Sequence, residues 1–186
     1  GTESYDAGVI AARLLTDRLS PTSDILMARI VHSGKNDSNQ GKNRRDGFCY
    51  YLKEVGFSGK LHEVELKISD SVYNFAKLNE IFELNPGIKG AIIFNSTCYI
   101  LGNYLKTRGM QAVKLVGYDL IERNTQLLSE GVITALIAQR PERQGYEGIK
   151  SLCNYLLFKQ KSEKVNLMPI DILLRENLKY YLNNKL

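Results

Sequence analysis

The 186-residue chain is 44% hydrophobic and 24% charged, which excludes a disordered or fibrous protein and is enough for one substantial core or two small lobes. Its formal charge of +5 comes from basic residues interleaved with acidic ones, without an aromatic platform or helix-turn-helix pattern, so we interpret it as solvated surface. Three distant cysteines, Cys49, Cys98 and Cys153, exclude complete disulfide pairing, give no metal-ligand spacing and indicate a reducing compartment.

Apolar residues alternate between helical and strand periodicity along the chain. Residues 5–19 show the spacing of one helical face, and Pro21 closes that helix. Dense or alternating apolar runs predict strands at residues 25–31, 61–66, 90–94 and 113–116. A polar loop covers residues 34–42, and helical patterns occupy residues 44–55, 72–82, 99–106 and 120–128. This alternation predicts an α/β fold, a doubly wound and mostly parallel sheet with helices on both faces.

In such a sheet, ligands collect where the strands end, and Asp119 follows a strand there. Asp119 and Glu122 have the spacing of a capping box, in which the carboxylate accepts N–H groups of the next helix. On the pattern alone a cap is favoured over a ligand contact. Both roles are compatible if one carboxylate oxygen caps and the other faces the cleft.

Three further stretches end at the same predicted edge. Arg44 is expected at the start of a helix, where the helix dipole disfavours a cation unless an anionic or hydroxyl-rich partner is present; an exposed arginine is the equal alternative. Asn95 and Ser96 follow a strand and could cap the next helix or bind a ligand. Gln139 precedes Pro141, which suits a first helical turn, and is otherwise a loop residue.

Catalytic interpretations have less support from the sequence. His32 and His62 are the two histidines, and neither lies in a recognisable nucleophile and base signature. No glycine-rich phosphate loop is present. We therefore expect a protein that is not an enzyme and needs no cofactor or metal.

Taken in order, these segments resemble the effector-binding domain of lac-repressor-family transcription regulators, which is similar to periplasmic sugar-binding proteins. The match rests on the joint order of short motifs, namely Ser4-Tyr5-Asp6-Ala7-Gly8, Arg44-Arg45-Asp46-Gly47-Phe48, Asn95-Ser96-Thr97, Val116-Gly117-Tyr118-Asp119 and Ala138-Gln139-Arg140-Pro141. The resemblance implies two α/β lobes around a sugar cleft. Residues 1–132 and 159–186 would form the C-terminal lobe, and residues 133–158 would return to an N-terminal lobe that is mostly missing from this chain.

The resemblance also implies which residues bind a sugar. Arg44, Asn95 or Ser96, Asp119 and Gln139 occupy the positions that hydrogen-bond sugar hydroxyls in the family, while Tyr5 and Tyr118 are candidates for stacking. Many members of the family read Asn-Asp at the second position, where an ungapped alignment places Ser96 and Thr97, so this sequence departs from that pattern and is more similar to a branch that reads Asn-Ser.

We therefore expect the ligand-sensing domain of a cytoplasmic, sugar-responsive regulator. It would form a homodimer and bind DNA only through a helix-turn-helix domain outside this chain. The longest apolar stretch is too short to cross a bilayer, so no membrane partner is expected. The alternative is a periplasmic solute-binding protein that feeds a transporter or a membrane sensor.

Overall fold

The computed structural model describes residues 2–31, 38–161, 163 and 165–183. His32 and residues 34–37 of the predicted polar loop lie outside these ranges. The helices are α1 (Ser4–Thr16), α2 (Asn39–Glu54), α3 (Ser71–Leu84), α4 (Cys98–Thr107), α5 (Glu122–Ser129), α6 (Pro141–Phe158) and α7 (Leu178–Asn183). The strands are β1 (Asp24–Ile30), β2 (Leu61–Leu66), β3 (Ile88–Ile93), β4 (Lys114–Tyr118), β5 (Ala135–Ala138) and β6 (Asp171–Leu173).

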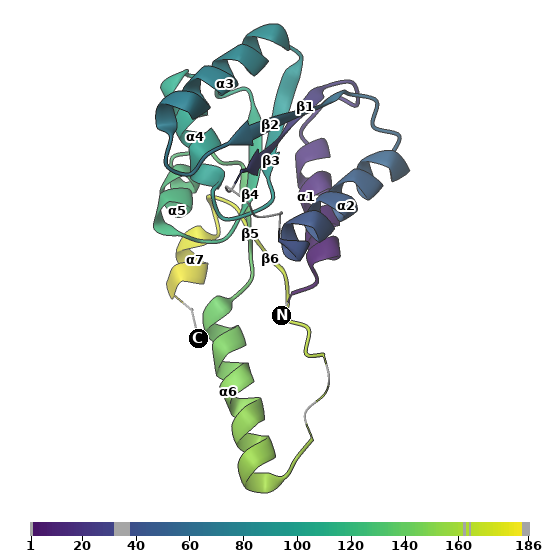
Figure 1. Ribbon diagram of the computed structural model, residues 1–186, viewed down its shortest axis with the longest axis vertical. Helices are drawn as coiled ribbons and strands as arrows, with labels where there is room; N and C mark the ends of the chain where they lie inside the picture. Colours follow the sequence, from purple (N-terminus) through teal and green to yellow (C-terminus); the bar gives the residue numbers. More distant parts are fainter. Residues whose placement is uncertain (1, 32–37, 162, 164, 184–186) are drawn as a thin grey trace.

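The six strands form one sheet in the order β2-β1-β3-β4-β5-β6 (Figure 1). All neighbouring strands are parallel except β5 and β6, which are antiparallel. This arrangement confirms the predicted doubly wound, mostly parallel sheet. The order reverses between β1 and β3, and the carboxyl ends of strands near such a reversal are where open α/β sheets bind ligands.

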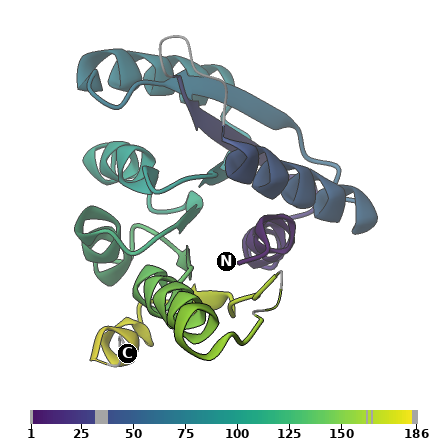
Figure 2. The same cartoon turned by 60° about the horizontal axis from the view of Figure 1, so that its bottom comes forward.

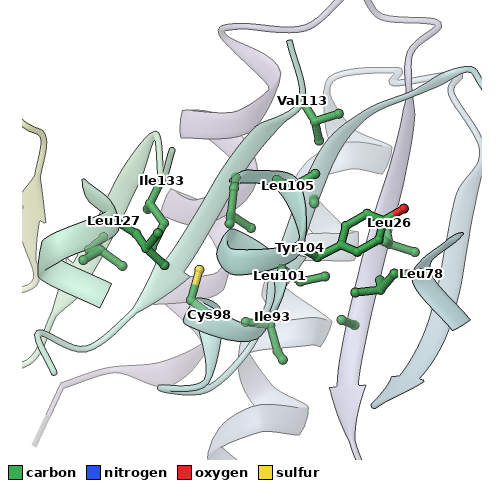
Figure 3. Close-up of a cluster of buried hydrophobic side chains, with 14 of the residues drawn as sticks. Leu26, Leu78, Ile93, Cys98, Leu101, Tyr104, Leu105, Val113, Leu127 and Ile133 are labelled. Atoms are coloured by element: carbon green, nitrogen blue, oxygen red, sulfur yellow. The ribbon is translucent and has the colours of Figure 1, made fainter. Parts of the chain in front are cut away.

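Each face of the sheet has its own core, because successive side chains of a strand point to opposite sides. On β3, Ala91 and Ile93 pack with residues of α3, α4 and α5, as Figure 3 shows for Ile93, Leu101 and Leu105. Ile92 points the other way and packs with residues of α1 and α2, including Leu15 and Phe48. The helices therefore cover both faces, as predicted.

Helices α1 and α2 pack so closely that their backbones are in direct contact at two glycines. A Cβ atom on Gly8 would lie 1.9 Å from the carbonyl oxygen of Arg44, and one on Gly47 would lie 2.1 Å from the carbonyl oxygen of Tyr5. Both glycines are therefore required by this contact, which fixes the position of the Arg44 backbone relative to α1.

Two helix starts differ from the prediction. Helix α2 begins at Asn39, not near Arg44, because the hydroxyl of Ser38 accepts the backbone N–H of Gly41 at 3.1 Å and caps it. The last residues of the predicted loop are therefore helical. Helix α5 begins at Glu122, two residues after the predicted start at Leu120.

Helix α6 projects away from the sheet, and the segment that follows it returns beside the N-terminus (Figures 1 and 2). None of its 18 residues is buried. Residue 133 was expected to begin the segment that leaves the lobe, but residues 135–138 form β5 within the sheet. The chain therefore leaves the sheet after Ala138. Among the described residues, no helix has the length and apolar character needed to span a membrane.

Candidate functional site

Asp119 and Gln139 meet at the carboxyl ends of β4 and β5. The Gln139 Nε2 atom donates to Asp119 Oδ1 at 2.5 Å, although the residues are 20 positions apart in sequence. Parallel pairing of β4 with β5 places Tyr118 opposite Ile137, so both strands end at the same level. Both side chains are only partly buried, which leaves polar atoms at this edge of the sheet for a ligand.

The predicted helix cap at Asp119 is wrong. The residue adopts a left-handed backbone conformation, with φ of 67°, and its own N–H donates to the carbonyl oxygen of Ile137. Residues 119–121 therefore lie outside α5, whose N-cap is Ile121 and has no side-chain cap. The carboxylate instead accepts from Gln139. Aspartate tolerates the left-handed region better than most residues, because its short side chain can bond locally.

Arg44 lies under this edge, in the second turn of α2, and is 2% exposed. Its Nη1 atom donates to the carbonyl oxygen of Phe94 at 2.9 Å, and its Cζ atom lies 4.1 Å from the centroid of the Tyr118 ring. The Nε and Nη2 atoms are buried and have no hydrogen-bond partner among the described residues. The expectation of an unfavourable helix-start position was wrong, since α2 begins one turn earlier.

Desolvation lowers the pKa of Arg44, while Tyr118 and Asp119 act in the opposite direction. Because the ordinary value for arginine is far above neutral pH, the guanidinium keeps its charge. It combines a cation–π contact with two donor nitrogens, Nε and Nη2, that have no acceptor among the described residues. Such donors normally find an acceptor when they are buried, so an oxygen-rich ligand would satisfy them.

Gln139 also connects the start of the chain to α2. Its Oε1 atom accepts from Gln40 Nε2 at 2.9 Å and from Thr2 Oγ1 at 3.2 Å. Its amide thus bridges Asp119 on one side and the beginnings of both α1 and α2 on the other. Sequence reasoning missed Gln40, because an isolated glutamine near a helix start carries no distinctive pattern.

Asn95 and Ser96 have different roles in the structure. Asn95 Oδ1 accepts from the backbone N–H of Thr97 at 2.9 Å and from its hydroxyl at 2.6 Å, which is the local turn that asparagine favours. Ser96 lies on the wall of the cavity at the strand ends. Of the two, the structure therefore leaves Ser96 facing the cavity.

Asn124, which the sequence reasoning also missed, connects the loop that follows β3 to the loop that follows β4. It is fully buried, and its Nδ2 atom donates to the carbonyl oxygens of Ser96, Tyr118 and Asp119 at 2.9, 3.0 and 3.1 Å. Its Oδ1 atom accepts the N–H of Tyr99 at 2.9 Å, in the first turn of α4. The available signal was its spacing, since Asn124 lies three and four residues before Leu127 and Leu128 and therefore shares the helix face of these two leucines.

Neither aromatic candidate is among the residues that line the cavity at the strand ends. Tyr5 is partly buried on α1, with its ring 5.9 Å from that of Tyr50, and no described contact joins it to Asp119 or Gln139. Tyr118 is completely buried, and its hydroxyl donates to the carbonyl oxygen of Ala7 at 3.1 Å. Burial raises the pKa of Tyr118. Tyr118 is thus a core residue that supports Arg44.

A cavity of about 560 Å³ opens at the strand ends, within the range of small-molecule sites. Ser96, Asp119, Gln139, Arg140 and Tyr181 contribute to its wall, and Arg44 is not among its lining residues. We call Arg44, Ser96, Asp119 and Gln139 the strand-end site. The cavity wall supplies a carboxylate, an amide and a hydroxyl, and Arg44 adds buried N–H donors outside that wall. This set suits a small ligand with several hydroxyl groups.

Known structures resemble this chain closely. A protein from Bacteroides fragilis, named as a candidate LacI transcriptional regulator, is 39% identical with a TM-score of 0.91 over 97% of this chain and 63% of its own. An Agrobacterium radiobacter carbohydrate transporter solute-binding protein, in complex with D-arabinose, is 21% identical with a TM-score of 0.80 over 95% of this chain and 61% of its own. An Actinobacillus succinogenes periplasmic solute-binding protein with bound D-allose is 17% identical, with a TM-score of 0.81 over 97% and 62%.

The chain thus spans less than two thirds of the length of these relatives. No match was found among curated proteins. The family model of the periplasmic binding protein domain matches residues 1–160, which is most of the chain. On this match, together with the sheet order and the site at its strand ends, the chain belongs to the periplasmic binding protein domain family.

Proposed function

We propose that the strand-end site binds a sugar and that the chain is part of the sensing domain of a lac-repressor-family transcription regulator. The observation that carries the proposal is the buried guanidinium of Arg44, whose Nε and Nη2 atoms have no partner among the described residues. An unsatisfied buried donor costs about 1–3 kcal/mol. Sugar hydroxyls are acceptors that would satisfy these donors.

The same site supplies complementary groups for vicinal hydroxyls. The carboxylate of Asp119 accepts, while Gln139 and Ser96 can both donate and accept. Charge-assisted hydrogen bonds strengthen where water is excluded, which favours a ligand enclosed between two lobes. Relatives that share the fold have been solved with D-arabinose, D-tagatose and D-allose, which supports a monosaccharide. We propose a binding domain and not an enzyme, with no cofactor.

The proposed fold of the complete protein has two lobes. Residues 1–132 and 159–186 belong to the C-terminal lobe, and the strand β5 extends that lobe to Ala138. The remaining part of the segment 133–158, helix α6, would pack against the N-terminal lobe outside this chain. Exposed apolar side chains on α6, among them Ile149, Leu152 and Leu156, support this, because they need a partner. Ligand-stabilised closure of the lobes would carry the signal.

The regulator is favoured over the transporter alternative because the relative that is 39% identical is a candidate regulator, whereas the transporter proteins named above are 21% identical or less. A regulator of this kind would be cytoplasmic, act as a homodimer and bind DNA through a helix-turn-helix domain outside this chain. The upstream codons of the gene test this directly. A helix-turn-helix supports the regulator, and a signal peptide supports transport.

Calorimetry on the full-length protein tests the ligand, with a panel of D-arabinose, D-tagatose, D-allose and other pentoses and hexoses. We expect one sugar to bind, and binding to be lost in Arg44→Ala and in Asp119→Ala. Lys106→Ala is a suitable control, because Lys106 pairs with Glu130 on the surface between α4 and α5. Unchanged affinity in both site variants would refute the assigned site. Light scattering that shows only monomers would refute the homodimer.

A further inference from the structure

An ion pair beside the strand-end site joins the turn that follows β5 to the first residue of β6. These two strands flank α6 in the sequence. Arg140 Nε donates to Asp171 Oδ2 at 2.5 Å, and Arg140 Nη2 donates to Asp171 Oδ1 at 2.8 Å. Arg140 follows β5 by two residues, and Asp171 is the first residue of β6. The antiparallel register places Ala138 opposite Asp171, so the ion pair closes the end of this strand pair. A two-point contact of this kind fixes orientation as well as distance.

Arg140 also adopts a strained backbone. Its φ of 48° and ψ of 61° are left-handed, a conformation that a non-glycine residue adopts at an energetic cost. Pro141 follows as the first residue of α6, and the carbonyl oxygen of Arg140 accepts the N–H of Gln144. The strained turn is therefore held from both sides, by the helix after it and by the side-chain contact with Asp171.

Gln139 lies between the paired residue Ala138 and this turn. Its backbone carbonyl accepts from Gln144 Nε2 at 2.5 Å, and its side chain reaches Asp119. Rotation of the turn at Arg140 would carry Gln139 away from Asp119, because no regular strand pairing holds residue 139 itself. The aromatic ring of Tyr181 on α7 lies 5.9 Å from the Arg140 guanidinium and flanks the pair on the cavity side.

We propose that Arg140 and Asp171 are positioning residues, whose ion pair holds Gln139 against Asp119 and fixes the point at which α6 turns out of the lobe. The proposal rests on the proposed function, since it assigns the pair an effect on sugar affinity. Both connections between α6 and the sheet pass this pair. Its loss would let the turn adopt orientations in which Gln139 does not face the ligand, which lowers apparent affinity in proportion to the competent fraction.

Calorimetry on the full-length protein tests the proposal, with whichever of D-arabinose, D-tagatose, D-allose and the other panel sugars binds the unmodified protein. Arg140→Ala and Asp171→Ala should each weaken binding about tenfold, and the double variant should be no weaker than the worse single one. Asp171→Asn keeps the size of the side chain and should also weaken binding. Additive losses, or affinity unchanged in the single variants, would overturn the proposal.

Arg140→Gly separates the ion pair from the backbone conformation. Glycine accepts the left-handed turn without strain but has no side chain for Asp171. If Arg140 acts through the ion pair, Arg140→Gly loses affinity as Arg140→Ala does. Full affinity in Arg140→Gly would show that only the backbone conformation matters and would overturn the proposal. Lys106→Ala, which breaks a surface ion pair, is the matched control and should bind normally.

Hydrogen exchange provides a readout that needs no ligand. Breaking the pair should speed exchange of the β6 amides and of the Gln144 amide, while the amides of β3 stay protected. If no sugar binds the unmodified protein, the proposed function fails, and the exchange result still decides whether the pair holds the turn. Exchange that is unchanged in Arg140→Ala and Asp171→Asn would overturn the role of the pair.

Discussion

Helices α1 and α6 have similar apolar patterns but opposite surroundings. Five residues of α1 are buried, namely Ala7, Gly8, Ala11, Ala12 and Leu15. Helix α6 is longer and buries none of its residues. Periodicity marks a helix that has an apolar face, but it does not tell which surface covers that face. Helix α1 therefore completes its packing within this chain, whereas α6 needs a partner to cover its apolar face.

The partner proposed for α6 is the N-terminal lobe outside this chain. Its exposed apolar residues continue to the end of the helix, where Leu157 and Phe158 are 72% and 67% exposed. Apolar surface of this extent on one helix normally marks an interface. We call the sheet and the helices packed on it the packed lobe. Substitutions in the packed lobe should therefore change the free energy of unfolding of this chain, whereas matching substitutions in α6 should not.

Leucine truncation gives the largest expected contrast. Leu101 is fully buried in the core of Figure 3, and Leu101→Ala should lower the free energy of unfolding by about 3 kcal/mol, since both transfer energy and a cavity contribute. Leu152 on α6 is 57% exposed, and Leu152→Ala should change the free energy of unfolding by less than about 0.5 kcal/mol. Urea denaturation of this chain measures both. Similar losses would mean that α6 is packed in solution.

The change in the free energy of unfolding caused by a glycine-to-alanine substitution should have opposite signs in the two regions. Gly8→Ala places a methyl group against the Arg44 carbonyl and should cost about 2–3 kcal/mol through overpacking. Gly148 on α6 has no atom within 4 Å of an added Cβ, so Gly148→Ala should stabilise the helix by up to about 1 kcal/mol. Thermal unfolding of both variants checks this. Stabilisation by Gly8→Ala would contradict the close contact of α1 and α2.

Sequence periodicity was sufficient for the strands β1 to β4 and for the helices between them, because each has a strong local pattern. It did not separate β5 from the departing segment, since the run Ala135–Ala138 is only four residues long and its assignment depends on pairing with β4 and β6. The helix α7 was not predicted. Its six residues gain their helical order from packing of Leu178 against the core, which the local sequence does not specify.

At the site, residue types were predictable and their contacts were not. The pairing of Asp119 with Gln139 depends on the register of β4 and β5, and the left-handed turn at Asp119 overrode a capping-box pattern that is reasonable locally. Asn124 was missed for the same reason. Its four hydrogen-bond partners come from the loop after β3, the first turn of α4 and the end of β4, which only the folded sheet brings together.

The next largest difference in stability between the two regions is expected when an asparagine is replaced by alanine. Asn124→Ala leaves three carbonyl oxygens and one N–H without their partner and should cost about 2 kcal/mol. Asn154→Ala on α6 is the control, because the contacts described for Asn154 at the end of α6, with the N–H groups of Lys159 and Gln160, use its backbone carbonyl. Urea midpoints that shift equally in the two variants would contradict the role assigned to Asn124.

The smallest effect concerns charge, at the far end of the packed lobe. Asp24 Oδ2 lies 2.9 Å from His62 Nε2, and Asp24 Oδ1 accepts the N–H of Lys60. These hydrogen bonds, first that from His62, lower the pKa of Asp24 below its ordinary value. A carboxyl whose pKa is lowered by folding adds stability above its unfolded pKa, and this stability disappears as pH falls through the folded pKa.

Asp24→Asn should therefore be less stable than the unmodified protein at neutral pH, and the difference should shrink as the pH falls below about 4. Denaturation at pH 7, 5 and 3 measures it. Glu147→Gln, which removes one carboxylate from α6, is the control for the loss of a negative charge. The packed lobe would then respond to pH through a specific pair that α6 lacks among the described residues. A difference in stability between Asp24→Asn and the unmodified protein that stays constant down to pH 3 would show that the pair does not stabilise the fold through its charge.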